Sequence, residues 1–236
     1  MKVFLTNDLP CIIRNLFDNY IGRHFDRFFQ DPLCIKLENT TGYHIYPSLR
    51  EGAIVYSGGV GGDISFELQL AKKYNAKIFL FDPTPTGINL MKKIKNKNIN
   101  FYKLGLSGKT GDFHFELLNR VNCGSYSMSQ KGGVVLPCIS ISDFYKKNKH
   151  SKIDLLKIDI EGFEYGVIDD ILSNDIDIQQ IVLEFHGWMK KMPRGLDKIA
   201  KRKLKEKGYV QVFKNRNDYT FVKESIKQNF ERLRRC

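Results

Sequence analysis

The sequence lacks the cysteine patterns that mark a disulfide framework or a zinc module. Its 5 cysteines are odd in number and scattered, with no C-x-x-C pair and no Cys/His group at zinc-ligand spacing. This pattern argues against zinc-finger proteins and small disulfide-rich secreted domains, and it is typical of reduced thiols. We therefore expect a cytoplasmic protein.

Long apolar runs are also missing. No stretch reaches the roughly 18 apolar residues that a transmembrane helix needs, and the first residues lack the apolar centre of a signal peptide. Internal repeats and low-complexity tracts are absent, which argues against repeat architectures. We expect no transmembrane segment, and the 236 residues are enough for one large domain with its own core.

Acidic residues are fewer than basic ones. The chain has 38 Lys and Arg against 26 Asp and Glu, a formal net charge of +12. Such a charge favours acidic partners, namely nucleic acid, anionic lipid, or phosphorylated and acidic sugars. Alternatively, the Lys, Asn and Ile content reflects a biased source genome. Residues 190–216 hold 11 Lys or Arg against 2 acids, and they form either a solvated helix face or a docking surface for an anionic acceptor.

Residues 53–83 form the most informative unit. Residues 54–56 are apolar, four glycines follow within residues 58–62, and apolar residues then recur at helical spacing up to residue 74. A second apolar run, residues 78–81, ends at Asp82. This order indicates a nucleotide-binding βαβ unit made of a strand, a glycine turn, a helix and a second strand that ends in an acid. In such a unit the acid binds ribose hydroxyls. The alternative is a turn that is glycine-rich for packing, with Asp82 as a cap before Pro83.

Alternating strands and helices continue to the end of the chain. Apolar runs at residues 99–104, 153–158 and 181–185 predict further core strands, and residues 209–214 and 219–223 predict a terminal hairpin. The other expected elements are a small hairpin at residues 35–38 and 43–46, a helix over 86–97, a turn over 105–111, two isolated strands at 112–118 and 134–138, and a mobile loop over 119–133. We predict an α/β, Rossmann-like class I methyltransferase fold, with a mostly parallel seven-stranded sheet that ends in an antiparallel hairpin and carries helices on both faces. The glycine spacing and the hairpin favour S-adenosylmethionine over NAD as the ligand.

The N-terminal residues have a different pattern. Apolar and aromatic residues recur at helical spacing through most of residues 1–35. We predict a helical segment over residues 1–40 and the catalytic domain over residues 41–236. The aromatic face would pack on the core or on a second copy, making a homo-oligomer, and a membrane-surface helix is the alternative.

Several ordered motifs resemble those of the FkbM family of methyltransferases. Residues 157–164, Lys-Ile-Asp-Ile-Glu-Gly-Phe-Glu, are similar to its K-x-D-x-E-G-x-E signature, and residues 182–186, Val-Leu-Glu-Phe-His, to its E-x-H strand ending. Residues 104–111, 81–85 and 60–67 also match. The resemblance runs from about residue 42 to residue 223. It implies S-adenosylmethionine as donor and O-methylation of a hydroxyl, often on a sugar or glycan.

The resemblance also implies site residues. Gly59 and Gly61 would contact the methionine and ribose parts of the donor, Asp82 the ribose, and Asp159 the amino or methyl end. The other expected cofactor-binding residues are Ser57, Asp63, Pro83 and Ser107. Ser57 departs from the pattern, because an acid is usual at that place.

The expected catalytic residues are His186, Asp159 and Glu161. His186 is the candidate general base, since it follows the fifth core strand and titrates near neutral pH. The alternatives are a structural histidine and a divalent metal held by Asp159, Glu161 and His186.

Three competing functions remain at this point. The basic charge suggests a nucleic-acid methyltransferase, but residues 159–162, Asp-Ile-Glu-Gly, replace the N/D/S-P-P-Y/F motif of amino-group enzymes. Base methylation is thus disfavoured, whereas RNA ribose or cap methylation stays open. An NAD-dependent oxidoreductase and a non-catalytic binding module are the other two. We expect a small-molecule or glycan acceptor and no nucleic-acid partner.

Overall fold

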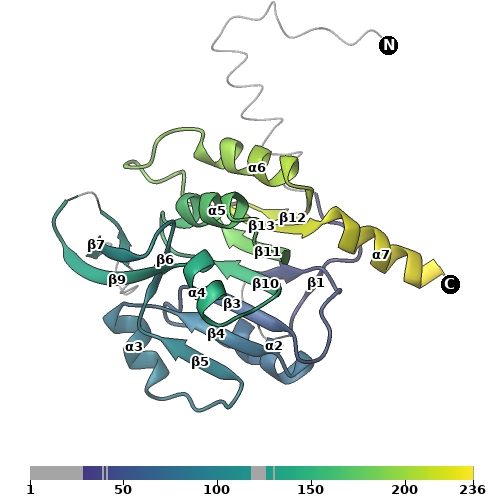
Figure 1. Ribbon diagram of the computed structural model, residues 1–236, viewed down its shortest axis with the longest axis horizontal. Helices are drawn as coiled ribbons and strands as arrows, with labels where there is room; N and C mark the ends of the chain where they lie inside the picture. Colours follow the sequence, from purple (N-terminus) through teal and green to yellow (C-terminus); the bar gives the residue numbers. More distant parts are fainter. Residues whose placement is uncertain (1–28, 39, 41, 118–125, 130, 236) are drawn as a thin grey trace, which may run out of the picture.

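A computed structural model shows the chain as an α/β protein built on a mixed seven-stranded sheet (Figure 1). It describes all residues except 1–28, 39, 41, 118–125, 130 and 236. The sheet has the order β12-β13-β11-β10-β3-β4-β5. Its strands are β3 (Ile54–Gly58), β4 (Lys77–Phe81), β5 (Ile99–Tyr102), β10 (Ile153–Ile158), β11 (Ile178–Glu184), β12 (Tyr209–Asn215) and β13 (Asp218–Lys223).

The direction of the strands follows from the connections. The five strands from β11 to β5 run parallel, and each parallel step requires a crossover. Strand β13 is antiparallel to both β11 and β12, because a tight turn between residues 215 and 218 joins it to β12. The predicted α/β architecture and the terminal hairpin are therefore present. All six residues of β10 are buried, as expected for a central strand covered on both faces.

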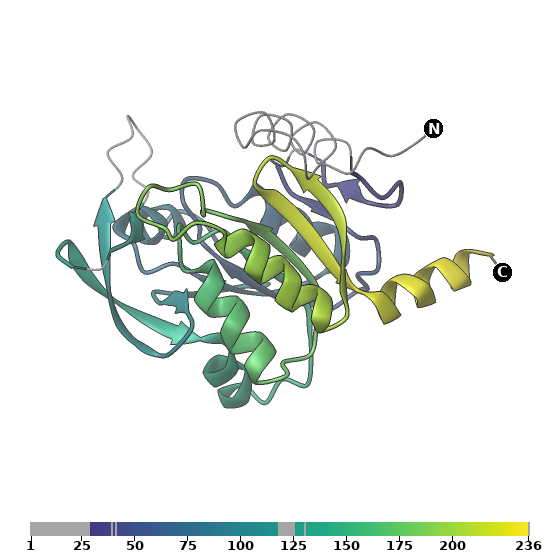
Figure 2. The same ribbon diagram turned by 90° about the horizontal axis from the view of Figure 1, so that it is seen from above.

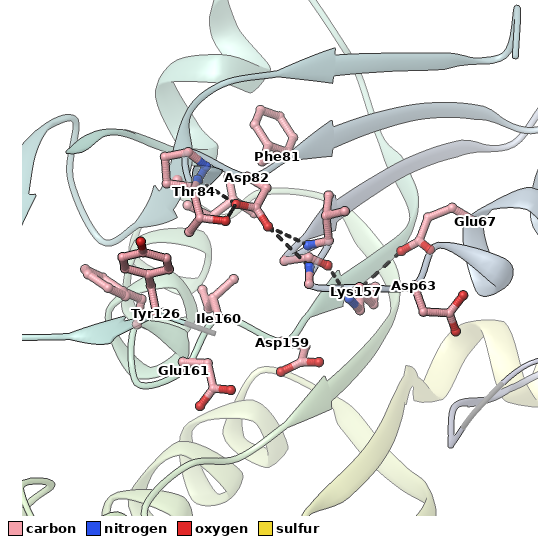
Figure 3. A pocket seen from close by; sticks show the side chains of 18 of the residues that line it. Asp63, Glu67, Phe81, Asp82, Thr84, Tyr126, Lys157, Asp159, Ile160 and Glu161 are labelled. Atoms are coloured by element: carbon pink, nitrogen blue, oxygen red, sulfur yellow. Dashed lines mark hydrogen bonds and ion pairs between the residues drawn. The ribbon is translucent and has the colours of Figure 1, made fainter. Parts of the chain in front are cut away.

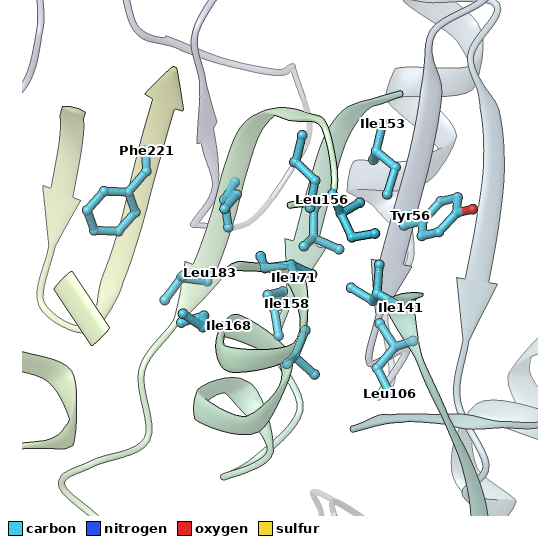
Figure 4. Close-up of a cluster of buried hydrophobic side chains, with 14 of the residues drawn as sticks. Tyr56, Leu106, Ile141, Ile153, Leu156, Ile158, Ile168, Ile171, Leu183 and Phe221 are labelled. Atoms are coloured by element: carbon cyan, nitrogen blue, oxygen red, sulfur yellow. The ribbon is translucent and has the colours of Figure 1, made fainter. Parts of the chain in front are cut away.

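Two hydrophobic clusters lie on opposite faces of the sheet. On one face, α4 (Ile141–Lys147), α5 (Glu164–Ser173) and α6 (Leu196–Glu206) contribute to a cluster that includes Tyr56 and Leu156 (Figure 4). On the other face, α2 (Ser65–Tyr74) packs with Val55 and Leu155, and the end of α3 (Pro85–Met91) contacts the same cluster. Neighbouring strand residues thus enter different clusters, as the period-two geometry of a strand requires. The expected helix over residues 86–97 ends earlier, at Met91.

A second sheet forms where the sequence suggested only isolated strands and turns. Its strands are β6 (Gly105–Ser107), β7 (Gly111–Leu117), β8 (Tyr126–Met128) and β9 (Val134–Ser140), in the order β6-β9-β7-β8. Residues 105–111 were expected to be a turn, but β6 pairs in parallel with β9. Part of the expected mobile loop over residues 119–133 is β8, and its residues 119–125 and 130 lie outside the described residues.

The two ends of the described chain meet the large sheet on the β12 side. Strands β1 (Ile35–Lys36) and β2 (His44–Ile45) form the predicted small hairpin, and Gln30 bridges to Phe213 of β12. Helix α7 (Glu224–Arg235) extends away from the body of the molecule (Figure 2). The predicted aromatic helix, and the oligomer through it, fall largely on residues 1–28, outside the described residues. No helix in the described part of the chain is long and apolar enough to cross a membrane.

Candidate active site

The glycine loop after β3 rests directly on the end of β10. Gly59 has a φ of +85°, and a Cβ added there would lie 1.8 Å from the carbonyl oxygen of Asp159. Only glycine permits that approach with that backbone conformation. Gly59 therefore brings the loop and the end of β10 together, whatever ligand the loop contacts.

The glycine loop, the ends of β4 and β10 and parts of the second sheet enclose a pocket of about 230 Å³ (Figure 3). The predicted site residues that line it are Gly59, Gly61, Asp63, Asp82, Pro83, Asp159 and Glu161. Ser57 and Ser107 do not line it. The Ser57 hydroxyl is buried and donates to Glu67, and the Ser107 hydroxyl donates to the carbonyl of Lys109.

Asp82 holds the glycine loop in place. Its Oδ2 accepts hydrogen bonds from the backbone N–H groups of Val60 (2.9 Å) and Gly61 (3.4 Å). Its Oδ1 accepts from the backbone N–H and the hydroxyl of Thr84, at 2.7 and 2.6 Å. Since four donors already surround this buried carboxylate, Asp82 orders the glycine loop, which is close to the capping role given above as the alternative. Its contact with ribose stays a prediction.

Three residues that the sequence analysis missed also line the pocket. Lys157 Nζ donates to the Gly59 carbonyl at 2.6 Å and lies 3.9 Å from Glu67 Oε1, and both side chains are buried. Glu67 in turn accepts from Ser57 at 2.5 Å. The acid that is absent at position 57 is thus supplied from α2. A lysine inside a fully buried strand was a signal for this network, whereas nothing in the sequence indicated the third residue, Tyr43.

A cluster of carboxylates surrounds His186 beside the pocket, at the same carboxyl edge of the sheet. His186 is 2% exposed. Its Nδ1 lies 2.5 Å from Glu164 Oε1, and its Nε2 lies 3.3 Å from Glu161 Oε2, 3.8 Å from Asp159 Oδ1 and 3.9 Å from Glu184 Oε1. The three predicted catalytic residues therefore come together. The structure adds Glu164 and Glu184 to them.

The turn from β10 into α5 positions these carboxylates. Glu161 has a φ of +52°, a left-handed conformation that costs a non-glycine residue about 1–3 kcal/mol. Both carboxylate oxygens of Glu164 accept from the Gly162 N–H at 3.1 Å. Glu164 therefore fixes the turn as well as the His186 ring. The Tyr43 hydroxyl donates to Asp159 Oδ2 at 2.7 Å and so holds the carboxylate oxygen that does not face His186.

The carboxylates strongly perturb the protonation of the cluster. Burial opposes a charged ring, but the hydrogen bond to Glu164 and the charges of Glu164, Glu161 and Asp159 raise the pKa of His186 to about 9. Burial and the charge of Asp159 raise the pKa of Glu184 to about 7. An imidazole with a pKa near 9 is cationic at neutral pH and cannot accept a proton. This state disfavours His186 as the general base, a role that stays a prediction.

The fold and the site together define an α/β enzyme with a glycine-loop pocket beside a carboxylate–histidine cluster. The FkbM methyltransferase domain matches residues 52–210, about two thirds of the chain. The chain therefore belongs to this family of methyltransferases, and its methyl donor is S-adenosylmethionine.

Individual relatives are more distant. The hexuronic acid methyltransferase AglP of Haloferax volcanii is 23% identical over 115 residues, which are 48% of this chain and 48% of that protein. The match thus spans about half the length of this curated relative. A fibrillarin pre-rRNA processing protein of Methanococcus jannaschii overlaps with a TM-score of 0.45 at 14% identity, over 78% of this chain and 71% of that one. The N-terminal domain of human METTL16 in complex with SAH has a TM-score of 0.42 and 14% sequence identity, and the overlap covers 92% of this chain and 71% of that one.

The lining of the pocket has features that an adenosyl ligand requires. Gly61 and Gly62 both line it, and a Cβ at either position would meet no protein atom within 4 Å, so the loop presents bare backbone to open space. Apolar side chains, among them Leu106 and Phe163, line it together with the polar ends of β4 and β10. An adenosyl group needs such a mixture of apolar walls and a few oriented polar groups.

Proposed function

We propose that this protein transfers the methyl group of S-adenosylmethionine to a hydroxyl oxygen of a sugar or glycan. One observation carries the proposal. Asp159 and Glu161 line the donor pocket and also belong to the cluster around His186. An acceptor that approaches through the cluster would therefore reach the donor at the end of β10.

The pocket residues suggest how the donor lies. Pro83 and Leu106 would contact the adenine, since they follow the second and third core strands. Asp82 would accept from the ribose hydroxyls, and Asp159 would face the amino or methyl end. The two carboxylates are on different strands, so the donor would extend across the carboxyl ends of β4, β3 and β10, where open α/β sheets bind ligands.

The cluster suits a hydroxyl acceptor. Methyl transfer to an alcohol forms an O–CH₃ bond, breaks the S–CH₃ bond and releases the hydroxyl proton. The carboxylates of Asp159 and Glu161 can accept a hydrogen bond from the hydroxyl and then take its proton, while the walls of the pocket exclude water. The S-adenosylmethionine methyl is already activated, so alignment supplies much of the remaining acceleration.

A sugar is favoured over RNA by the local charge. Asp159, Glu161 and Glu184 place several acids where the acceptor would approach, and such a surface repels a phosphate backbone. The relative AglP is named for methylating a hexuronic acid, which supports a sugar acceptor. The basic residues of segment 190–216 give less support for an anionic acceptor than their number suggests. Three of them, Lys191, Lys203 and Lys207, already pair with acids of this chain. These pairs support the interpretation as a solvated face.

The proposal is tested in two stages with the purified chain. Thermal unfolding with S-adenosylhomocysteine at about 100 times its dissociation constant should show a stabilisation of roughly 2.7 kcal/mol, and NAD should show none. Transfer of labelled methyl groups is then measured with neutral hexosides, hexuronosides and RNA as acceptors. Label that appears as an alkali-stable methyl ether on a sugar supports the proposal. Label on RNA alone, or on an amine, would refute it.

A further inference from the structure

We propose that Asp159, Glu184 and His186 bind one divalent cation at the acceptor edge of the donor pocket. Only the role of this cation in methyl transfer rests on the function proposed above, because the binding itself can be measured without any acceptor. The sequence suggested Glu161 as the third ligand of a metal alternative. The structure places Glu184 in that position instead.

The ligand atoms have suitable spacing. One atom each from Asp159, Glu184 and His186 lies within 4.8 Å of the other two. His186 Nε2 is 3.8 Å from Asp159 Oδ1 and 3.9 Å from Glu184 Oε1. Ligands about 2.1 Å from a common ion and separated by angles of 90–130° lie roughly 3–4 Å apart. The two distances from His186 Nε2 fall in this range, and the Asp159 and Glu184 oxygens, within 4.8 Å of each other, would move closer around an ion.

The surrounding bonds orient the ligands toward that space. The fully buried Glu164 holds His186 Nδ1 at 2.5 Å, which directs Nε2 into the cluster. Tyr43 holds Asp159 Oδ2, which leaves Oδ1 on the side of His186. A carboxylate on the far nitrogen of a histidine is the arrangement that fixes metal-ligating imidazoles in proteins. Glu164 would therefore act as the outer partner that orients the His186 ring toward the ion.

The charge balance leads to the same conclusion. Within the described part of the chain, the ion pairs of Asp159, Glu164 and Glu184 are all with His186. One imidazole faces several carboxylates, although the whole chain carries a net charge of +12. Buried and half-buried carboxylates are stabilised either by protonation or by a compensating cation. A divalent ion would supply the second.

The ion would also explain how an acidic site accepts an acidic sugar. Carboxylate and imidazole ligands suit Mn²⁺ and related divalent ions, and His186 would bind as the neutral imidazole after Nε2 releases its proton to solvent. Three protein ligands leave positions for acceptor oxygens. A sugar hydroxyl or carboxylate coordinated there would no longer be repelled. The acceptor hydroxyl would lose its proton more readily, the proton would pass to Glu161, and the oxygen would attack the methyl group.

The test is a titration with Mn²⁺ of the full chain after EDTA treatment and desalting. Binding is measured by calorimetry and by the loss of the electron paramagnetic resonance signal of free Mn²⁺. We expect one site per chain. Glu184→Gln should weaken binding by more than about tenfold, because even outer partners of metal ligands contribute 10–100-fold. The control is Glu206→Gln, since Glu206 is 66% exposed on α6 and pairs with Arg202. It should bind Mn²⁺ like the unmodified chain.

Each protein is also tested for thermal stabilisation by S-adenosylhomocysteine, which shows that the variants are folded. No Mn²⁺ binding up to about 1 mM, the weak end of protein sites, or equal binding by Glu184→Gln, would refute the cation site. If S-adenosylhomocysteine still binds in that case, the methyltransferase proposal stands without a metal. Mn²⁺ binding without S-adenosylhomocysteine binding would instead support the cation site and count against the donor pocket.

Discussion

Three glycines of the loop after β3 should respond differently to the same substitution. Gly59, Gly61 and Gly62 all line the pocket that we propose for the donor. Their backbones differ, however, with φ values of +85° and +54° at Gly59 and Gly61, while Gly62 is outside the left-handed region. Alanine at each position therefore separates steric clash, backbone strain and ligand contact within one loop.

Gly59→Ala should be the most damaging change. The new Cβ would lie 1.8 Å from the Asp159 carbonyl oxygen, whereas real Cβ contacts are essentially never under 3.0 Å, so the two backbones must separate by at least 1.2 Å. Forced overpacking costs about 1–3 kcal/mol, and the left-handed conformation adds about 1–2 kcal/mol. The sum of about 2–5 kcal/mol corresponds to a Tm lowered by roughly 4–20 °C in a chain of this size.

The other two glycines provide the matched controls. Gly61→Ala meets no atom within 4 Å, so only its positive φ is costly, about 1–2 kcal/mol. Gly62→Ala has neither a clash nor a positive φ, and its stability should stay within about 0.5 kcal/mol of the unmodified chain. Because Gly62 lines the pocket, its methyl group should still weaken S-adenosylhomocysteine binding by about tenfold, or 1.4 kcal/mol.

The assay is urea and thermal unfolding of the three variants, with and without S-adenosylhomocysteine. Gly59→Ala is expected to be the least stable of the three variants, Gly61→Ala intermediate and Gly62→Ala the most stable. If Gly59→Ala were as stable as Gly62→Ala, the close packing of the loop on β10 would be wrong. If Gly62→Ala bound S-adenosylhomocysteine as tightly as the unmodified chain, the donor would lie elsewhere.

Two further predictions concern ion pairs. Lys157→Met should destabilise the protein by roughly 3–5 kcal/mol, because it leaves buried Glu67 without its cation. In urea unfolding, the double variant with Glu67→Gln should recover part of this loss. A Lys157→Met variant of unchanged stability would contradict the prediction. Burial opposes ionisation of Asp31, but hydrogen bonds from Lys227 and the Leu33 backbone lower its pKa. With a depressed folded pKa, this stabilisation is present above about pH 4 and lost as pH falls through the folded pKa. Lys227→Met should therefore lower Tm more at pH 7 than at pH 2, and equal losses would refute the linkage.

The sequence determined the architecture because the signals for it are local. Alternating apolar runs and helical stripes fixed the core strands and most helices, and the short turn before β13 fixed the hairpin. The meeting of Asp159, Glu161 and His186 was also predictable. Each residue follows a parallel strand, and the carboxyl ends of neighbouring parallel strands lie at one edge of a sheet.

The tertiary structure decided which atoms face one another at that edge. Asp82 bonds to the glycine loop, Glu67 takes the place of the acid absent at position 57, and Glu184 rather than Glu161 joins the proposed cation ligands. The strand β6 within an expected turn likewise depends on its pairing with β9. A periodic pattern reports which face of an element is buried. It contains no information on the side chain that a distant element places against that face, because hydrogen bonds and ion pairs depend on ångström-scale packing between elements that only the folded chain defines.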